Sequence, residues 1–128
     1  MHSSYFAILD VDGNAQKELQ LAANVSEWLI AKNFWQLFNE QFETDFAHFE
    51  DFTLPVAKIE WLVLGLENQI KDLTQFDDVL ASFRYGWTAE KVELLCDVEP
   101  VTFTQEIRAL VLLLQAAKRQ NNEVYCQL

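Results

Sequence analysis

Two carboxylates near the N-terminus have the residue types and spacing for phosphate or metal chemistry. Asp10 and Asp12 follow an apolar, β-favouring segment in the string ILDVDGN. Paired carboxylates can act as nucleophile and general acid or base, or they can bind a divalent cation. For calcium, an EF-hand loop starting at Asp10 would need glycine sixth and glutamate twelfth, where this chain has Ala15 and Leu21. The calcium interpretation therefore fails.

The string ILDVDGN resembles the first motif of haloacid-dehalogenase-type phosphatases. In that family the first aspartate, here Asp10, is the nucleophile and the second, here Asp12, is an acid/base. Asn14 stands where the family normally has threonine, and neither a glycine-flanked acidic pair nor a βαβ alternation follows. A helix N-cap role for Asp12 would explain the string without catalysis. We predict that the chain is not an enzyme, with a small magnesium-dependent, phosphatase-like enzyme as an alternative.

The other reactive side chains lack a recognisable setting. His48 has no histidine or cysteine companion at metal-ligand spacing, and His2 lies in the terminal segment. Cys96 lies among apolar residues of a predicted helix, which is typical of an inert, buried thiol. We therefore predict no catalytic residue, no cofactor and no metal site.

A stripe of phenylalanines dominates residues 33–57. At about 100° per residue, six of them fall within an arc of roughly 120° on a continuous helix. These are Phe34, Phe38, Phe42, Phe46, Phe49 and Phe52. The same segment contains Glu40, Glu43, Asp45, Glu50 and Asp51 but no lysine or arginine. We predict that the rings pack inward and that the carboxylates face water as a docking surface.

The net charge of the chain indicates which classes of partner it can bind. Twenty acidic residues against nine basic ones give a formal charge of −11. Such a field repels phosphate backbones and anionic headgroups, so we expect neither nucleic acid nor a membrane as the partner. It attracts a basic protein, and it also keeps the chain in solution.

In size, acidity, helicity and cytoplasmic character the chain resembles bacterial immunity proteins, which neutralise toxin domains, many of them basic nucleases. The resemblance implies a non-enzymatic protein that binds a basic toxin domain and occludes its substrate-binding surface. Glu40, Glu43, Glu50 and Asp51 would attract the toxin, and Trp35 would anchor it as an exposed aromatic residue.

Other binding functions remain open. The chain could be a nucleic-acid mimic that blocks a DNA- or RNA-binding protein, or a subunit of a larger assembly.

Length and composition suit one domain spanning residues 1–128, because 51% of the 128 residues are hydrophobic. Two cysteines without metal-like spacing, Cys96 and Cys126, suggest a reducing compartment. No secretory signal is recognisable, and no apolar run reaches the roughly 18 residues of a membrane span. We therefore predict a cytoplasmic location.

Three glycines and two prolines favour long helices over many tight hairpins. We predict a mainly α, compact multi-helix fold, with an α+β fold containing a small terminal β element as the alternative. The expected elements are a strand over 4–11, a helix over 15–32 broken near Asn24, two helices over 33–52 separated at Thr44-Asp45, a helix over 55–73, one over 76–85 ended by Gly86, one over 88–98 capped by Thr88, and one from a capping box at Thr102 to about Gln120. Residues 123–128 are expected to be a frayed tail or a strand beside 4–11, and Gly65 is expected at a close helix crossing.

Overall fold

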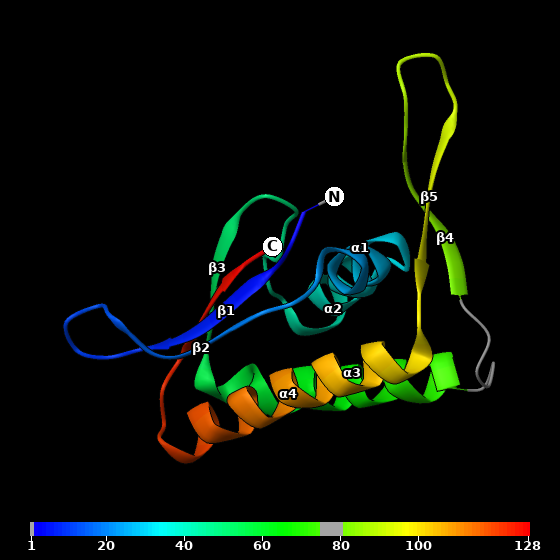
Figure 1. The fold of residues 1–128 in the computed structure, drawn as a ribbon. Coiled ribbons are helices and arrows are strands. Elements are labelled where there is room, and N and C mark those ends of the chain that lie inside the picture. Colours follow the sequence, from blue (N-terminus) through cyan, green and yellow to red (C-terminus); the bar gives the residue numbers. More distant parts are fainter. Residues whose placement is uncertain (1, 75–80) are drawn as a thin grey trace.

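The computed structural model describes residues 2–74 and 81–128, which form an α+β fold of two antiparallel sheets and four α-helices (Figure 1). In chain order the elements are β1 (Tyr5–Leu9), β2 (Ala15–Gln20), α1 (Ala23–Ala31), α2 (Phe34–Phe42), β3 (Asp51–Leu54), a 3₁₀ turn η1 (Val56–Lys58), α3 (Ile59–Thr74), β4 (Ala81–Trp87), β5 (Glu93–Val98), α4 (Pro100–Arg119) and β6 (Val124–Gln127). The prediction of a mainly α fold is wrong, because strands occupy much of three segments that we expected to be helical.

The larger sheet has the strand order β2-β1-β6-β3, and each neighbouring pair is antiparallel. The two terminal segments pair directly, with Phe6 opposite Cys126. The strand that we considered for residues 123–128 is therefore present, and it lies in the middle of the sheet. Phe6, Ala7 and Ile8 are completely buried, in keeping with the central place of β1.

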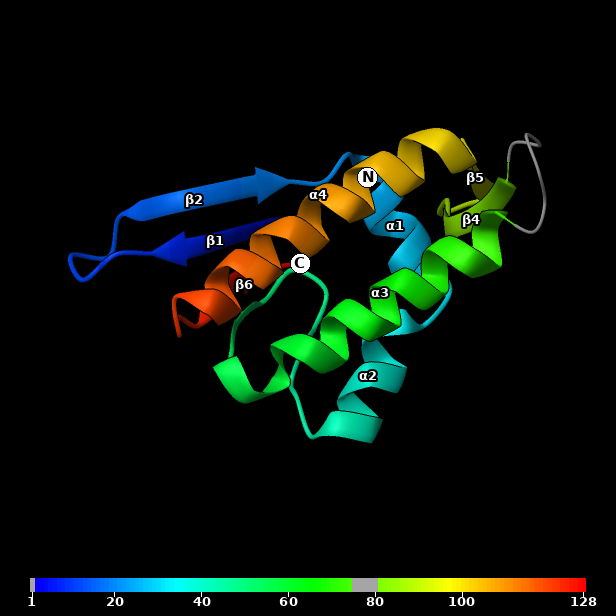
Figure 2. The same cartoon turned by 90° about the horizontal axis from the view of Figure 1, so that it is seen from below.

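Helices α3 and α4 run side by side along one face of this sheet, and α1 and α2 lie next to it (Figures 1 and 2). Large side chains from both layers form one core. The sheet contributes Phe6, Ile8, Leu54 and Val124, and α4 contributes Phe103, Ile107, Leu110 and Leu114. Burying each such side chain stabilises the fold by about 1.5–3 kcal/mol. Among the residues that the structure describes, no helix covers the opposite face of the sheet in Figure 1.

The helix predicted over 15–32 begins later than expected. Residues Ala15–Gln20 pair with β1 as strand β2, and α1 starts only at Ala23. The segment AQKELQ consists mostly of good helix formers. Pairing with the apolar strand β1 overrides that propensity, since strand preference depends on cross-strand neighbours.

The two helices predicted over 76–85 and 88–98 are also wrong within the described residues, where β4 and β5 form a hairpin. Residues 76–80 of the first lie outside the described part of the chain. Thr88 closes the hairpin loop: its N–H donates to Val92 O at 2.9 Å, and its Oγ1 accepts from Val92 N at 3.1 Å. Gly86 lies within β4 at a register shift instead of ending a helix.

The phenylalanine segment contains one helix, not two. Helix α2 ends at Phe42, and Glu43 takes a left-handed conformation with φ 55°. The predicted break near Thr44 is confirmed, but no helix restarts at Phe46. The Asn39 side chain holds the following loop instead: its Nδ2 donates to Phe46 O at 2.7 Å, and its Oδ1 accepts from Phe46 N at 2.8 Å and from Thr44 Oγ1 at 2.7 Å.

Gly65 confirms the predicted close helix contact. A Cβ on this residue of α3 would lie 3.2 Å from Cε2 of Phe34 on α2. The capping box predicted at Thr102 is wrong, because α4 begins at Pro100 and Thr102 Oγ1 donates to Glu99 within the first turn. Among the described residues, no helix is long and apolar enough to cross a membrane.

Candidate protein-binding surface

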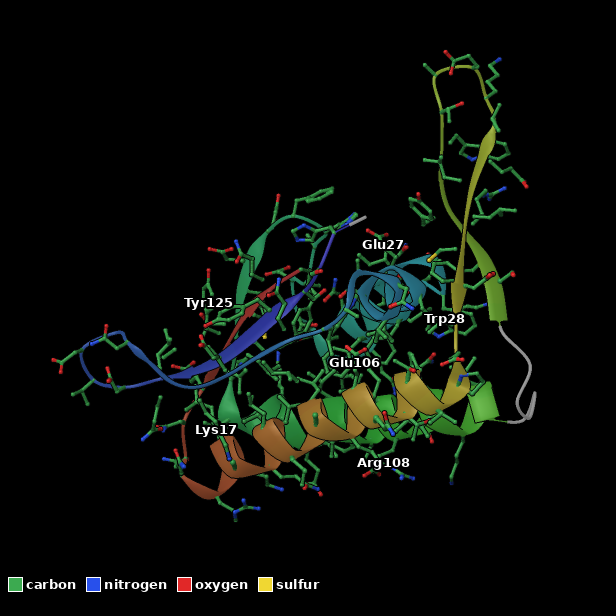
Figure 3. The ribbon with its side chains drawn as sticks, viewed as in Figure 1. Lys17, Glu27, Trp28, Glu106, Arg108 and Tyr125 are labelled. Carbon is green, nitrogen blue, oxygen red and sulfur yellow. The ribbon has the colours of Figure 1, made fainter. Side chains whose placement is uncertain are left out.

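The face of the larger sheet turned away from α4 carries aromatic and acidic side chains. Residues directly opposite one another in a sheet share a face, as do alternate residues along a strand. The register places Tyr5, Ala7, Glu18, Gln20, Asp51, Thr53, Tyr125 and Gln127 on this side. We call these residues the outer face, and none of them is a lysine or arginine. Lys17 points to the other side of the sheet, toward α4, as Figure 3 shows.

Two tyrosines form the centre of the outer face. The Tyr5 hydroxyl donates to Glu18 Oε2 at 2.5 Å, and Asp51 is the hydrogen-bonding group that acts on the pKa of Tyr125. The two rings meet edge to face with centroids 6.3 Å apart. Each ring is half-buried, whereas Glu18 and Asp51 are exposed. The result is a pair of ordered rings, each with a carboxylate at its hydroxyl.

The hydrogen bonds shift the tyrosine pKa values. Hydrogen bonding to Glu18, followed by burial and by the charge of Glu18, raises the pKa of Tyr5 above its usual value. The pKa of Tyr125 is raised for the same reasons by Asp51. Both phenols are therefore neutral donors at physiological pH.

Phe49 lies two residues before Asp51, beside the end of β6, and is the exposed ring of the phenylalanine stripe. Its side chain is 68% exposed, and its backbone has φ 66°, which is an outlier for a bulky residue. The Phe49 N–H donates to Leu128 O at 2.6 Å, and Leu128 N donates to Glu50 O at 3.2 Å. The ends of β3 and β6 thus hold this unfavourable conformation in place.

His48 supports the Phe49 ring from behind. The two rings stack with centroids 3.8 Å apart and an angle of 19° between their planes. His48 Nε2 lies 3.5 Å from Oε1 of Glu27, which is only 4% exposed. The same Glu27 oxygen accepts the backbone N–H of His2 at 3.0 Å. Phe49 therefore rests on a partly buried polar cluster that also secures the N-terminal segment.

The structure places the predicted binding residues as follows. Glu40 lies on α2, Glu43 is its C-cap, and Glu50 and Asp51 lie at the start of β3; all four are exposed. Asp51 therefore lies on the outer face and Glu50 next to it, whereas Glu40 and Glu43 lie on α2 and at its C-terminal end. Lys58 lies beside Glu43, since its Nζ donates to Glu43 O at 2.9 Å.

The prediction that Trp35 is an exposed anchor is wrong. Its side chain is 4% exposed and contacts the rings of Phe34 and Phe46, with centroids 4.9 and 4.5 Å away. The prediction of inward rings holds for Phe34, Phe38 and Phe46, which are buried, but not for Phe49. Phe42 and Phe52 are half-buried.

Sequence reasoning missed Phe49 as the exposed ring because it assigned all six phenylalanines to helical faces. The sequence offered no local signal against this, because Phe46 and Phe52 lie three residues before and after Phe49, at helical spacing. The two tyrosines gave no signal, since their pairing depends on β1 and β6 meeting across the whole chain.

A second exposed surface lies on the β4–β5 hairpin, which projects from the body of the molecule (Figure 1). Trp87, Val92 and Leu95 are each more than half exposed. Arg84 lies over the Trp87 ring at 4.6 Å and 3.5 Å from Glu93. Because this surface mixes both signs of charge, it favours a basic partner less than the outer face does.

Asp10 and Asp12 lie in the turn between β1 and β2. Asp10 Oδ1 accepts the backbone N–H groups of Asp12 and Asn14, each at 2.9 Å, and Gly13 has φ 81°. Asp12 therefore does not cap a helix as predicted. The turn gives Asp10 a structural role, because it satisfies two backbone donors of the hairpin.

The two cysteines are free and differ in burial. Cys126 on β6 is buried, and burial raises the pKa of its thiol, which makes the nucleophilic thiolate inaccessible at neutral pH. Cys96 is half-buried on β5, so its predicted place on a helix is wrong.

A scan against protein-family models, a search of curated proteins and a search of solved structures each found no match for this chain.

Proposed function

We propose that this chain is a non-enzymatic protein-binding domain that binds a basic protein, as bacterial immunity proteins do with toxin domains. The observation that carries the proposal is the base-free outer face, with two tyrosines and two carboxylates, next to the exposed Phe49. Aromatic side chains flanked by carboxylates suit arginine and lysine, which stack on rings and pair with carboxylates.

The parts of this surface have different roles in the proposal. Phe49 is the apolar anchor, since its ring is exposed and the backbone hydrogen bonds that Phe49 and Glu50 form with Leu128 hold its position. Glu40, Glu43, Glu50 and Asp51 steer the basic partner toward the surface and raise the association rate. Occlusion of the partner's substrate-binding surface would then neutralise it.

The proposal includes a cytoplasmic location, where a reducing environment would keep Cys96 and Cys126 as thiols. A nucleic-acid mimic would share the acidic surface, and plain duplex DNA distinguishes the two functions. DNA should compete with a mimic for the partner, whereas a toxin antagonist need not be displaced.

The experiment is co-expression with a toxin-like protein encoded next to this chain, followed by binding measurements on the purified pair. Reversal of Glu40, Glu43, Glu50 and Asp51 to lysine should slow association by at least about tenfold at low salt. The matched control reverses Glu67, Asp72, Glu90 and Glu123, four exposed acids elsewhere, and changes the net charge equally.

If both quadruple variants slow association by the same factor, the net charge contributes to binding but the assigned surface is wrong. If the chain gives no protection and no complex forms with any adjacent product, the neutralising function itself is contradicted.

A further inference from the structure

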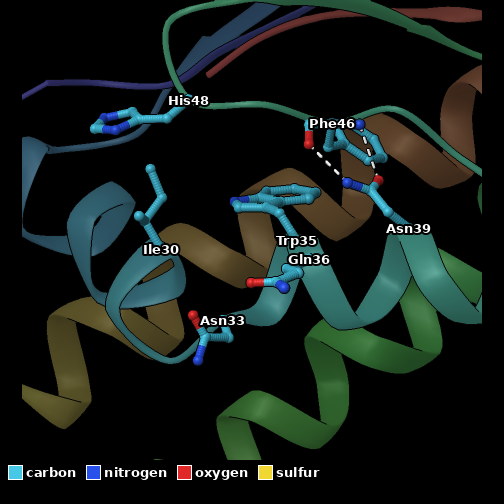
Figure 4. A pocket seen from close by; sticks show the side chains of 7 residues that line it. All are labelled: Ile30, Asn33, Trp35, Gln36, Asn39, Phe46 and His48. Carbon is cyan, nitrogen blue, oxygen red and sulfur yellow. Dashed lines mark hydrogen bonds between the residues drawn. The ribbon is translucent and has the colours of Figure 1, made fainter.

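A pocket of about 240 Å³ opens between α1, α2 and the loop that follows α2 (Figure 4). Ile30, Phe46 and the indole of Trp35 form its apolar walls, and Asn33, Gln36 and His48 bring polar groups to it. The amides of Asn33 and Gln36 belong to exposed residues. A space of this size suits a group as large as a side chain, and it is smaller than most drug-sized sites.

The indole N–H of Trp35 has no hydrogen-bond partner within residues 2–74 and 81–128, although the side chain is 96% buried. In Figure 4 the nitrogen-bearing edge of the indole is turned toward Ile30, below His48. Native proteins rarely leave a buried donor unpaired, because the group loses its water without compensation. An acceptor inside the pocket would satisfy this N–H.

The charges around the pocket select a neutral acceptor. The buried carboxylate of Glu27 lies 3.5 Å from His48 Nε2, and the whole chain carries a charge of −11. Both disfavour an anion. The Asn33 and Gln36 amides each offer a donor and an acceptor, which complements a group that has both.

We propose that this pocket binds a neutral primary amide or similar planar carbonyl group, whose oxygen accepts the indole proton of Trp35. The amide belongs either to a free small molecule or to an asparagine or glutamine side chain of a protein. This site does not depend on the proposed function, so each can fail alone.

The test follows the four tryptophan indole N–H signals of the ¹⁵N-labelled chain by NMR. Nicotinamide is the free-amide probe, the tripeptide Gly-Gln-Gly presents a side-chain amide, and Gly-Gly-Gly controls for backbone groups. The signal missing in Trp35→Phe identifies Trp35. The chemical shift of the Trp35 indole signal should change in a saturable way on addition of nicotinamide, of Gly-Gln-Gly, or of both. It should not change on addition of Gly-Gly-Gly.

Trp28 provides the internal control. Its indole N–H is also buried without a partner among the described residues, but it lines a different space, with Lys32 4.5 Å from the ring centroid. The chemical shift of its indole signal should not change when either probe is added. A response to nicotinamide alone identifies a small-molecule site, and a response to Gly-Gln-Gly identifies a site for a partner's side chain.

Trp35→Phe keeps an aromatic ring and removes the N–H, so affinity for the responding probe, followed in this variant by the backbone amide signal of Gln36, should fall about tenfold, as expected for one lost hydrogen bond. Gln36→Ala changes only an exposed rim residue and should weaken binding several-fold, which keeps the test valid if Trp35→Phe does not fold. The proposal is overturned if neither amide moves the Trp35 signal, or if Trp28 and Trp35 respond alike.

Discussion

Tyr125 on β6 and Asp51 on β3 lie one register step apart on the outer face of the sheet, and hydrogen bonding to Asp51 raises the pKa of Tyr125. Asp51 is also one of the four carboxylates that we expect to steer a basic partner. The contact therefore joins an ordered ring to a charge at the proposed binding surface.

The tyrosine contacts should make the free energy of unfolding fall as pH rises in the alkaline range. Because the pKa values of Tyr5 and Tyr125 are raised in the folded state, their contribution is present below the unfolded pKa of about 10 and is lost as pH rises through the folded values. The free energy of unfolding, measured in urea across this range, should fall with pH. Tyr125→Phe and Tyr5→Phe should each make the fall shallower, and three parallel curves would contradict the assignment.

The backbone at Phe49 should be strained. At φ 66°, glycine avoids a Cβ penalty of roughly 1–2 kcal/mol. Phe49→Gly should therefore be more stable than Phe49→Ala by about 1 kcal/mol, whereas in an ordinary extended or helical position glycine would be the less stable residue. Urea unfolding of the two variants tests this, and a more stable alanine variant would show that the residue is not left-handed in solution.

Asn39 should be the main support of the loop between α2 and β3. Asn39→Ala removes three hydrogen bonds and should lower the free energy of unfolding by about 2–3 kcal/mol. Gln41→Ala, at an exposed site on the same helix, should change it by no more than about 0.5 kcal/mol. Equal effects would mean that the Asn39 bonds contribute little.

Gly65 should be required for the contact between α3 and α2. A methyl group there would press on Phe34 at 3.2 Å, and we expect this overpacking to exceed the helix-propensity gain of about 1 kcal/mol. Gly65→Ala should thus destabilise the wild-type chain but stabilise a Phe34→Leu background. A double-mutant cycle measures the coupling, and additive effects would contradict the close contact.

Local sequence patterns predicted some helices and strands correctly. The remaining elements depend on pairing with segments that are distant in the sequence. The apolar run around Phe6, the helix after Pro100 and the break near Thr44 were recognisable because each depends on nearby residues. Strand β2 was not, since its helix-forming residues become a strand only beside β1. Thr88 shows a second limit: a hydroxyl before a polar stretch can cap a helix or close a hairpin, and the sequence alone does not distinguish them.

The candidate surface was only partly predictable for the same reason. Exposed carboxylates at Glu40, Glu43, Glu50 and Asp51 followed from charge alone. Choosing between Trp35 and Phe49 as the exposed ring required knowing that the chain leaves the helix after Phe42. Tyr5 and Tyr125 came together only through the pairing of the two termini.

The most direct test of the binding surface is a map of backbone amide NMR shifts when the unlabelled basic partner is added to the ¹⁵N-labelled chain. We predict that the largest changes fall at Tyr5, Phe49, Asp51 and Tyr125, and that they shrink when salt is raised from about 0.05 M to about 0.5 M. Changes concentrated instead at Trp87 and Leu95 of the β4–β5 hairpin, and insensitive to salt, would contradict the account.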